Sequence, residues 1–94
     1  MTAIRWSPEA ADDLEAIRGY IARNSPHYAH LAVQRIAASI ELLASSPGMG
    51  RVVPELDDPE VREVVVGPYR VVYRYRHETV EIATIFHGAR LFRM

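Results

Sequence analysis

The stretch VREVVVGPYRVVYRYRHETVEIATIFH, residues 61–87, decides the fold of this 94-residue chain. Valine, tyrosine and isoleucine, which favour strands, recur throughout it, and the pattern is interrupted at two points. Gly67-Pro68 is the first interruption and His77-Glu78 is the second. The pattern predicts three strands, at residues 61–66, 69–76 and 79–87, joined by tight turns into an antiparallel meander.

Two helix start signals precede this meander. Ser7 followed by Pro8, and Ser25 followed by Pro26, each place an N-cap residue before a proline at the first helical position. Apolar residues then recur at helical spacing, as Ala10, Leu14, Ile17 and Ile21 in the first segment and as Val33, Ile36, Ala37, Ile40 and Leu43 in the second. With Asn24 as the expected stop of the first helix, the short gap predicts an antiparallel helical hairpin.

The remaining segments complete the order of elements. AIRW, residues 3–6, predicts a short strand, and VVPELDDPE, residues 52–60, predicts an acidic connection between the hairpin and the meander. The expected fold is therefore α+β: a short N-terminal strand, an antiparallel helical hairpin and a three-stranded antiparallel meander, with both helices on one face of the sheet. Residues 1–94 are expected to form a single domain.

Strand residues alternate between the two faces of a sheet, so tight turns determine which side chains share a face. The helix-covered face is expected to carry Val64, Tyr69, Val71, Tyr73, Tyr75, Val80, Ile82, Thr84 and Phe86. The opposite face, called the outer face below, is expected to carry Glu63, Arg70, Val72, Arg74, Arg76, Glu81, Ala83, Ile85 and His87. This register places Val72 opposite Ala83 and Arg70 opposite Ile85.

Charged side chains gather on this outer face. Glu63 becomes a diagonal neighbour of Arg70 and Arg74, and His87 becomes a diagonal neighbour of Arg70. Arg74 lies opposite Glu81, so we expect a cross-strand ion pair that ties the two strands together. Arg70 has no acid directly opposite, which leaves it available for either a structural or a functional role.

Composition limits the classes of protein that the chain can represent. Its hydrophobic content of 49% fits a folded domain, and the absence of cysteine excludes disulfides and thiolate chemistry. The start MTAIRWSPEA has no signal-peptide core and no stretch is apolar enough to cross a bilayer, so a cytoplasmic location is expected. His27 and His30 have ligand-like spacing but are expected to form a solvated helix surface, so no metal and no cofactor are expected.

Four stretches together resemble the RelE/ParE superfamily of toxins from type II toxin–antitoxin systems: WSPEAADDLEAIRGYIARNSP, PGMGRVVPEL, REVVVGPYRVVYRYR and IATIFHGAR. The resemblance covers nearly the whole chain and keeps the order of elements. It implies a small toxin that a cognate antitoxin neutralises, usually in a heterotetramer of two toxins and two antitoxins. It also implies that operator DNA is bound only through the antitoxin.

The RelE branch of this superfamily cleaves mRNA on the ribosome. Cleavage by 2′-hydroxyl attack needs a base, an acid and cations that hold the phosphate. The resemblance offers Glu55 or Glu63 as the base and His87 as the acid. The phosphate clamps would be Arg51, Arg70 and Arg90. Arg70, in YRVVY, matches an arginine that is functional in the nuclease branch.

The ParE branch, which poisons DNA gyrase without nuclease chemistry, is the closer match. The ribosome-dependent nucleases are strongly basic and rich in lysine, whereas this chain has a net charge of −1 and all eleven of its basic residues are arginine. His87 and Arg90 also fit the H-x-x-R pattern of ParE, and only Phe92 could serve as the base-stacking aromatic of the nucleases.

The expected function is therefore that of a gyrase-inhibiting toxin without catalytic residues. Its surface for the target or the antitoxin would comprise Arg51, Glu63, Arg70, His87 and Arg90. One alternative is a ribosome-dependent mRNA endoribonuclease with Glu55, Arg70 and His87 as its catalytic residues. Another is a non-toxic module that only binds the antitoxin.

Overall fold

A computed structural model describes residues 2–89 as two helices and a five-stranded sheet. The elements are β1 (Ala3–Trp6), α1 (Pro8–Ala22), α2 (Pro26–Leu42), β2 (Arg51–Val52), β3 (Val61–Val66), β4 (Tyr69–Arg76) and β5 (Thr79–His87). The strand order is β1-β5-β4-β3-β2, and only β1 and β5 run parallel. The predicted α+β fold is confirmed, and β2, which lies in the expected 52–60 connection and just before it, is an addition.

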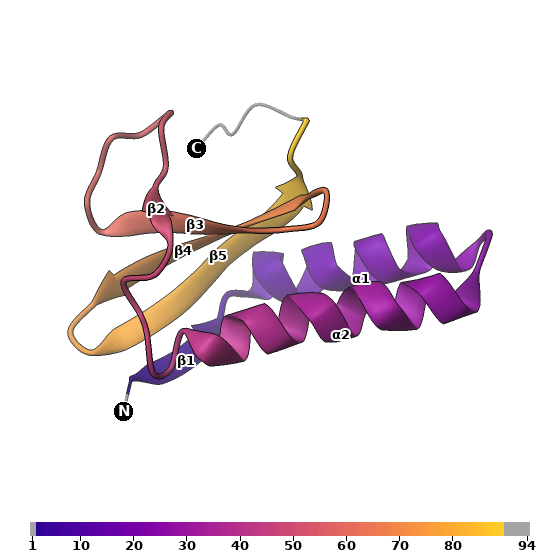
Figure 1. The fold of residues 1–94 in the computed structure, drawn as a ribbon, viewed down its shortest axis with the longest axis horizontal. Helices are drawn as coiled ribbons and strands as arrows, with labels where there is room; N and C mark the ends of the chain where they lie inside the picture. Colours follow the sequence, from indigo (N-terminus) through magenta and orange to yellow (C-terminus); the bar gives the residue numbers. More distant parts are fainter. Residues whose placement is uncertain (1, 90–94) are drawn as a thin grey trace.

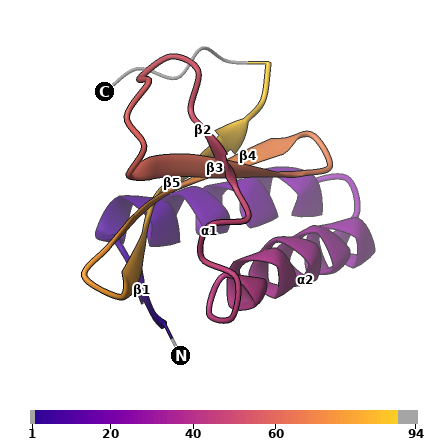
Figure 2. The ribbon, with the colours of Figure 1, turned by 60° about the vertical axis from the view of Figure 1, so that its left-hand side comes forward.

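The helical hairpin lies against one face of the sheet, and the 53–60 connection arches over the other (Figure 1). The same layers appear from a second direction (Figure 2). Both predicted helix starts are confirmed, because the side chains of Ser7 and Ser25 accept hydrogen bonds from the amides of Ala10 and Tyr28. The first helix ends at Ala22, two residues before the expected stop at Asn24. Neither helix in this part of the chain is long and apolar enough to cross a membrane.

The main core fills the space between the helices and the sheet. Its fully or almost fully buried members are Ala10, Ile36, Ile40, Leu43, Val71, Tyr73, Val80, Ile82 and Ile85. Most of these residues belong to the predicted helix stripes and to the predicted helix-covered face. The apolar periodicity of the sequence therefore located the main core, as expected where one face of each element is buried.

A second, smaller core lies on the outer face. Val53, Val61, Val72 and Phe86 are buried there, and Leu56 and Ala83 pack against them. The 53–60 connection supplies the cover for this cluster, so that part of the outer face is closed to solvent. The sequence patterns did not predict this cover, because the connection carries no periodic signal.

Strand register follows the prediction at both turns and then departs from it in β5. Val66 pairs with Tyr69 and Arg76 pairs with Thr79, as expected for two-residue loops. Tyr73 pairs with Ile82 but Val72 pairs with Thr84, so Ala83 is an extra residue that forms a β-bulge.

The bulge corrects the predicted faces of residues 85–87, whereas Thr84 lies toward α1 as predicted. Arg70 pairs with Phe86 instead of Ile85, and Tyr69 pairs with His87. Phe86 therefore lies on the outer face with Arg70, while Ile85 joins the main core. A single inserted residue exchanges the two faces, because side chains alternate along a strand.

Helix α1 holds the bulge in place. Ser7 Oγ donates to the carbonyl of Ala83 at 2.8 Å while accepting from the amide of Ala10. Asp13 Oδ2 accepts from Thr84 Oγ1 at 2.6 Å and from the amide of Ile85 at 3.0 Å. The polar groups that the bulge removes from the strand ladder thus find partners on the helix.

The β4–β5 turn adopts an unusual backbone for its residues. His77 and Glu78 have φ angles of 51° and 56°. Such two-residue hairpin turns favour Asn-Gly, because side chains with a Cβ are strained at positive φ. The strands, and not an optimal turn sequence, therefore determine this register.

Candidate functional site

A buried ion pair between β3 and β4 forms the centre of the outer face. Arg70 Nε donates to Glu63 Oε1 at 2.7 Å. Glu63 is 1% exposed and Arg70 is 8% exposed, although both residue types usually lie at the surface. The predicted diagonal relationship between them is confirmed, and their burial means that each charge depends on the other for compensation.

Arg51 and Glu55 complete an arginine–glutamate network of four residues. Arg51, in β2, donates through Nε to Glu63 Oε2 at 2.6 Å. Glu55, in the 53–60 connection, accepts from Nη1 and Nη2 of Arg70, both at 2.8 Å. Two carboxylates and two guanidiniums thus balance in charge, and the paired hydrogen bonds fix the connection over the sheet.

The environment of Arg70 stabilises its charged form. The hydrogen bonds to Glu55, with further support from Glu63, raise the pKa of the guanidinium above its ordinary value, although burial opposes them. The guanidinium carbon also lies 5.0 Å from the ring centroid of Phe86, a cation–π contact. Arg70 is therefore a permanently charged residue, and each of its three guanidinium nitrogens already donates to a carboxylate.

The predicted ion pair between Arg74 and Glu81 is wrong. It lies opposite Glu81 in the register, as expected. Its ion pairs, however, are with Glu60 at 3.2 Å and Asp58 at 3.7 Å, both in the connection. The connection places these two acids over Arg74, so the arginine ties the connection to the sheet instead of tying β4 to β5.

His87 lies apart from the network. The bulge turns its side chain toward α1, where it helps line a hollow of about 430 Å³ with Asp13, Tyr20 and Tyr69. Its ring makes an edge contact with Tyr69, and its Nδ1 accepts from the amide of Ala89. The predicted neighbourhood of His87 and Arg70 is therefore wrong, because it assumed a regular strand.

The remaining predicted residues divide between the surface and the undescribed end of the chain. Arg51 exposes 62% of its side chain, so it is the accessible cation of the network. Arg90 lies outside the described residues. Across residues 2–89, no three histidine, aspartate or glutamate side chains converge as metal ligands would.

Tyr73 organises the chain just before β2, a role that the sequence patterns did not reveal. Its hydroxyl donates to the carbonyl of Pro47 at 2.8 Å and accepts from the amide of Gly50 at 3.0 Å. Arg62 donates to the carbonyl of Gly50 at 2.9 Å. Burial raises the pKa of the Tyr73 hydroxyl, since the neutral form tolerates the core better.

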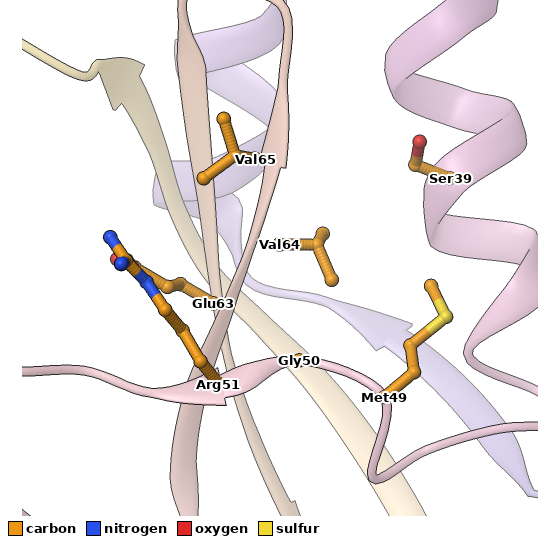
Figure 3. A pocket seen from close by; sticks show the side chains of 7 residues that line it. All are labelled: Ser39, Met49, Gly50, Arg51, Glu63, Val64 and Val65. Atoms are coloured by element: carbon orange, nitrogen blue, oxygen red, sulfur yellow. The ribbon is translucent and has the colours of Figure 1, made fainter.

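Gly50 has no room for a side chain. A Cβ there would lie 2.6 Å from the Tyr73 hydroxyl and 2.7 Å from the carbonyl of Glu63. This close approach lets the chain leave the sheet at Gly50 and cross toward α2. A hollow opens beside it between α2 and β3, lined by Ser39, Met49, Val64 and Val65 among others (Figure 3).

Comparison with known proteins agrees with this fold. Residues 4–92 match the family described as ParE toxin of type II toxin-antitoxin system, parDE. Toxin RelE2 of Caulobacter vibrioides is 38% identical over 92 residues, which cover 97% of this chain and all of that protein. A chain of a structure titled chromosomal ParDE TA system from P. aeruginosa superposes with a TM-score of 0.74 at 28% identity, covering 93% of this chain and 96% of that one. The chain therefore belongs to the ParE toxin family of type II toxin–antitoxin systems.

Proposed function

We propose that this toxin inhibits DNA gyrase by binding to it and carries out no nuclease chemistry. Membership of the ParE family makes the chain a toxin with an antitoxin partner. One observation favours gyrase over mRNA on the ribosome as the target. The residues that a nuclease would need to bring together are separated.

That separation concerns the acid, the base and the phosphate clamp of the alternative mechanism. A general base must reach the proton that it removes, but Glu63 is 1% exposed and binds two guanidiniums. Each nitrogen of the Arg70 guanidinium already donates to Glu55 or Glu63, so it has little capacity left for a phosphate. His87 points to the other side of β5, toward α1. These contacts support a structural role for the network.

The ribosome-dependent nuclease remains the second candidate, because Glu55 and Arg70 do lie together. Glu55 is on the connection, and its side chain is 24% exposed. Movement of the connection would free both a carboxylate and a guanidinium on the same side of the sheet. This arrangement would satisfy part of the requirement for a base and a phosphate clamp.

Supercoiling by purified gyrase tests the proposal. We expect the toxin to block supercoiling and to accumulate cleaved DNA, and we expect the cognate antitoxin, added first, to prevent both effects. Unaffected gyrase together with new mRNA cleavage sites on translating ribosomes, mapped by primer extension, would favour the nuclease. If neither target responds and expression without antitoxin leaves growth normal, the chain is a non-toxic antitoxin-binding module.

The complex with the antitoxin is proposed to contain two copies of each protein, with operator DNA bound by the antitoxin. Arg51 and His87 are exposed on different sides of the sheet and are proposed, with Arg90, to contact the antitoxin or the target. Light scattering of the purified complex measures the stoichiometry. A complex of one toxin and one antitoxin would contradict the proposed stoichiometry of two copies each.

A further inference from the structure

The hollow between α1 and the ends of β4 and β5 contains a carboxylate without a cation. Asp13 receives its hydrogen bonds from Thr84 and Ile85 at one oxygen, Oδ2. Its Oδ1 has no partner among residues 2–89 and is open to solvent. Within the same residues, no arginine or histidine forms an ion pair with Asp13. A half-buried charge is thus left without compensation, which favours the binding of a cation.

Aromatic rings line this hollow of about 430 Å³. Tyr20 follows Asp13 along the same stripe of α1, two helical turns later. Tyr69 and His87 pair across β4 and β5, with ring centroids 5.9 Å apart. The Nδ1 atom of His87 accepts from the amide of Ala89, as it does in a neutral imidazole. Aromatic rings beside a carboxylate are surroundings in which proteins bind guanidinium and ammonium groups.

Helix α1 adds negative charge around the hollow. Its sequence, PEAADDLEAIRGYIA, holds four acids and one arginine, a net charge of −3. Arg18 pairs with Glu15, so it does not neutralise Asp13. The electrostatic potential of this face therefore attracts a basic partner and repels phosphate and carboxylate groups.

We propose that the hollow binds an arginine side chain of the target protein, with the guanidinium on Asp13 Oδ1 and against the rings of Tyr20 and Tyr69. This inference rests on the proposed function, in which that target is gyrase. An enzyme that holds DNA presents arginine and lysine to the phosphates, so gyrase carries basic surfaces that complement α1. Arginine suits the hollow better than lysine, because its planar guanidinium stacks on aromatic rings and is more weakly hydrated.

The same argument favours gyrase over the antitoxin as the source of the arginine. The antitoxin is proposed to bind operator DNA while it holds the toxin, so phosphates engage its DNA-binding arginines. The toxin acts on gyrase only when it is free of antitoxin, so a site for gyrase need not be covered in the toxin–antitoxin complex. Antitoxin binding should therefore not depend on Asp13 or Tyr20.

A small probe tests the site without any partner protein. N-acetyl-arginine-N-methylamide, added at constant ionic strength, should shift the ring signals of Tyr20, Tyr69 and His87 in NMR spectra. For one carboxylate contact and one cation–π contact we expect a Kd of about 1–10 mM. The uncharged citrulline analogue should leave these signals unchanged. Asp13→Asn keeps an acceptor for the β5 bulge but removes the charge, so it should weaken probe binding about fivefold or more.

Binding of purified gyrase to the whole toxin, measured by biolayer interferometry, tests the identity of the ligand. Asp13→Asn and Tyr20→Leu should each weaken gyrase binding about tenfold, while antitoxin binding stays within about twofold of wild type. Ala16→Lys places an ammonium on α1 within reach of Asp13, so it should fill the site and weaken gyrase binding as well. The control Asp12→Asn removes the same charge from an exposed position outside the hollow and should bind gyrase within about twofold of wild type.

Wild-type affinity for gyrase in Asp13→Asn, Tyr20→Leu and Ala16→Lys would overturn the inference. So would equal binding of the arginine and citrulline probes, or weakened antitoxin binding in place of weakened gyrase binding, which would assign the hollow to the antitoxin. Probe binding to Arg90→Gln but not to the wild type would also overturn it, because the chain's own arginine would then fill the site. If wild-type toxin binds the probe but no gyrase, the proposed function fails and gyrase is excluded as the ligand, whereas the arginine site itself stands.

Discussion

The guanidinium of Arg70 lies over the ring of Phe86, with the guanidinium carbon 5.0 Å from the ring centroid, on the face of the sheet away from the helices. This contact exists only because Ala83 is an extra residue in β5. Without the bulge, Phe86 would point toward the helices and Ile85 would occupy its place. The aromatic ring beside the arginine–glutamate network is thus a product of one inserted residue.

Loss of the α1 contact to the bulge should destabilise the protein. Asp13→Ala leaves Thr84 Oγ1 and the amide of Ile85 without their shared acceptor, and we expect a loss of about 1–3 kcal/mol in the free energy of unfolding. Asp13→Asn keeps an acceptor oxygen and should lose less. Urea unfolding followed by circular dichroism measures both. Equal losses for the two variants would show that the carboxylate charge, and not the acceptor, matters.

Removing Arg70 should be more damaging than removing a surface arginine. Arg70→Met leaves the buried carboxylate of Glu63 with Arg51 alone, so we expect a loss of about 3–5 kcal/mol. The double variant Arg70→Met/Glu63→Leu removes both charges and should recover part of that stability. Arg76→Met is the matched surface control and should change stability by less than about 0.5 kcal/mol. A single Arg70→Met variant as stable as this control would contradict a structural role for the network.

Stability should fall at alkaline pH through Tyr73. Folding raises the pKa of this hydroxyl above its ordinary value of about 10, so the folded state holds the proton more tightly. The resulting stabilisation is complete below pH 10 and is lost as the pH rises through the folded-state pKa. Tyr73→Phe should be less stable at neutral pH, because the amide of Gly50 loses its acceptor, and should lack this alkaline decline. Unfolding in urea at pH 8 and pH 11 compares the two proteins, and parallel declines would exclude Tyr73 as the cause.

Two neighbouring glycines should respond differently to alanine. A Cβ at Gly50 would meet the Tyr73 hydroxyl at 2.6 Å and the main chain of β3 at 2.7 Å, so Gly50→Ala should lose about 1–3 kcal/mol. Gly48→Ala meets nothing within 4 Å and should be close to neutral. Thermal unfolding of the pair measures the difference. Similar melting temperatures would mean that the chain before β2 can move away from Tyr73 without loss.

The β4–β5 turn can be improved. His77→Asn with Glu78→Gly supplies the residues that tolerate the observed positive φ angles, so we expect a gain of about 1 kcal/mol. Chemical unfolding of the double variant measures this gain. A loss of stability would indicate that the His77 or Glu78 side chain makes a favourable contribution of its own.

The sequence predicted those parts of the fold that depend on local patterns. Ser7 and Ser25 identified both helix starts, and Val66 with Tyr69 fixed the first hairpin register. The bulge at Ala83 was missed, because its stabilising partners on α1 are more than 70 residues away in sequence. The alternation of apolar and polar residues alone could not distinguish a regular strand from a bulged one.

The candidate site was predicted only in part, for the same reason. Glu63 and Arg70 came together because they lie on adjacent strands. His87 was assigned to the wrong face, because it follows the bulge. Glu55 was considered as a base, but its position over Arg70 depends on a connection without periodic pattern. Pairing between a loop residue and a strand residue leaves no short-range signal in a single sequence.

Because Ser7 donates a hydrogen bond to Ala83 and β1 pairs in parallel with β5, the toxin can complete its fold only after β5 has been translated. Translation produces β1 and α1 first, yet the strand that joins them to the rest of the sheet is made after every other described element. A nascent or prematurely terminated chain that lacks β5 loses the neighbour of both β1 and β4, together with four residues of the two cores. Such a fragment cannot assemble the folded surface, so harmful activity should arise only from chains translated past His87.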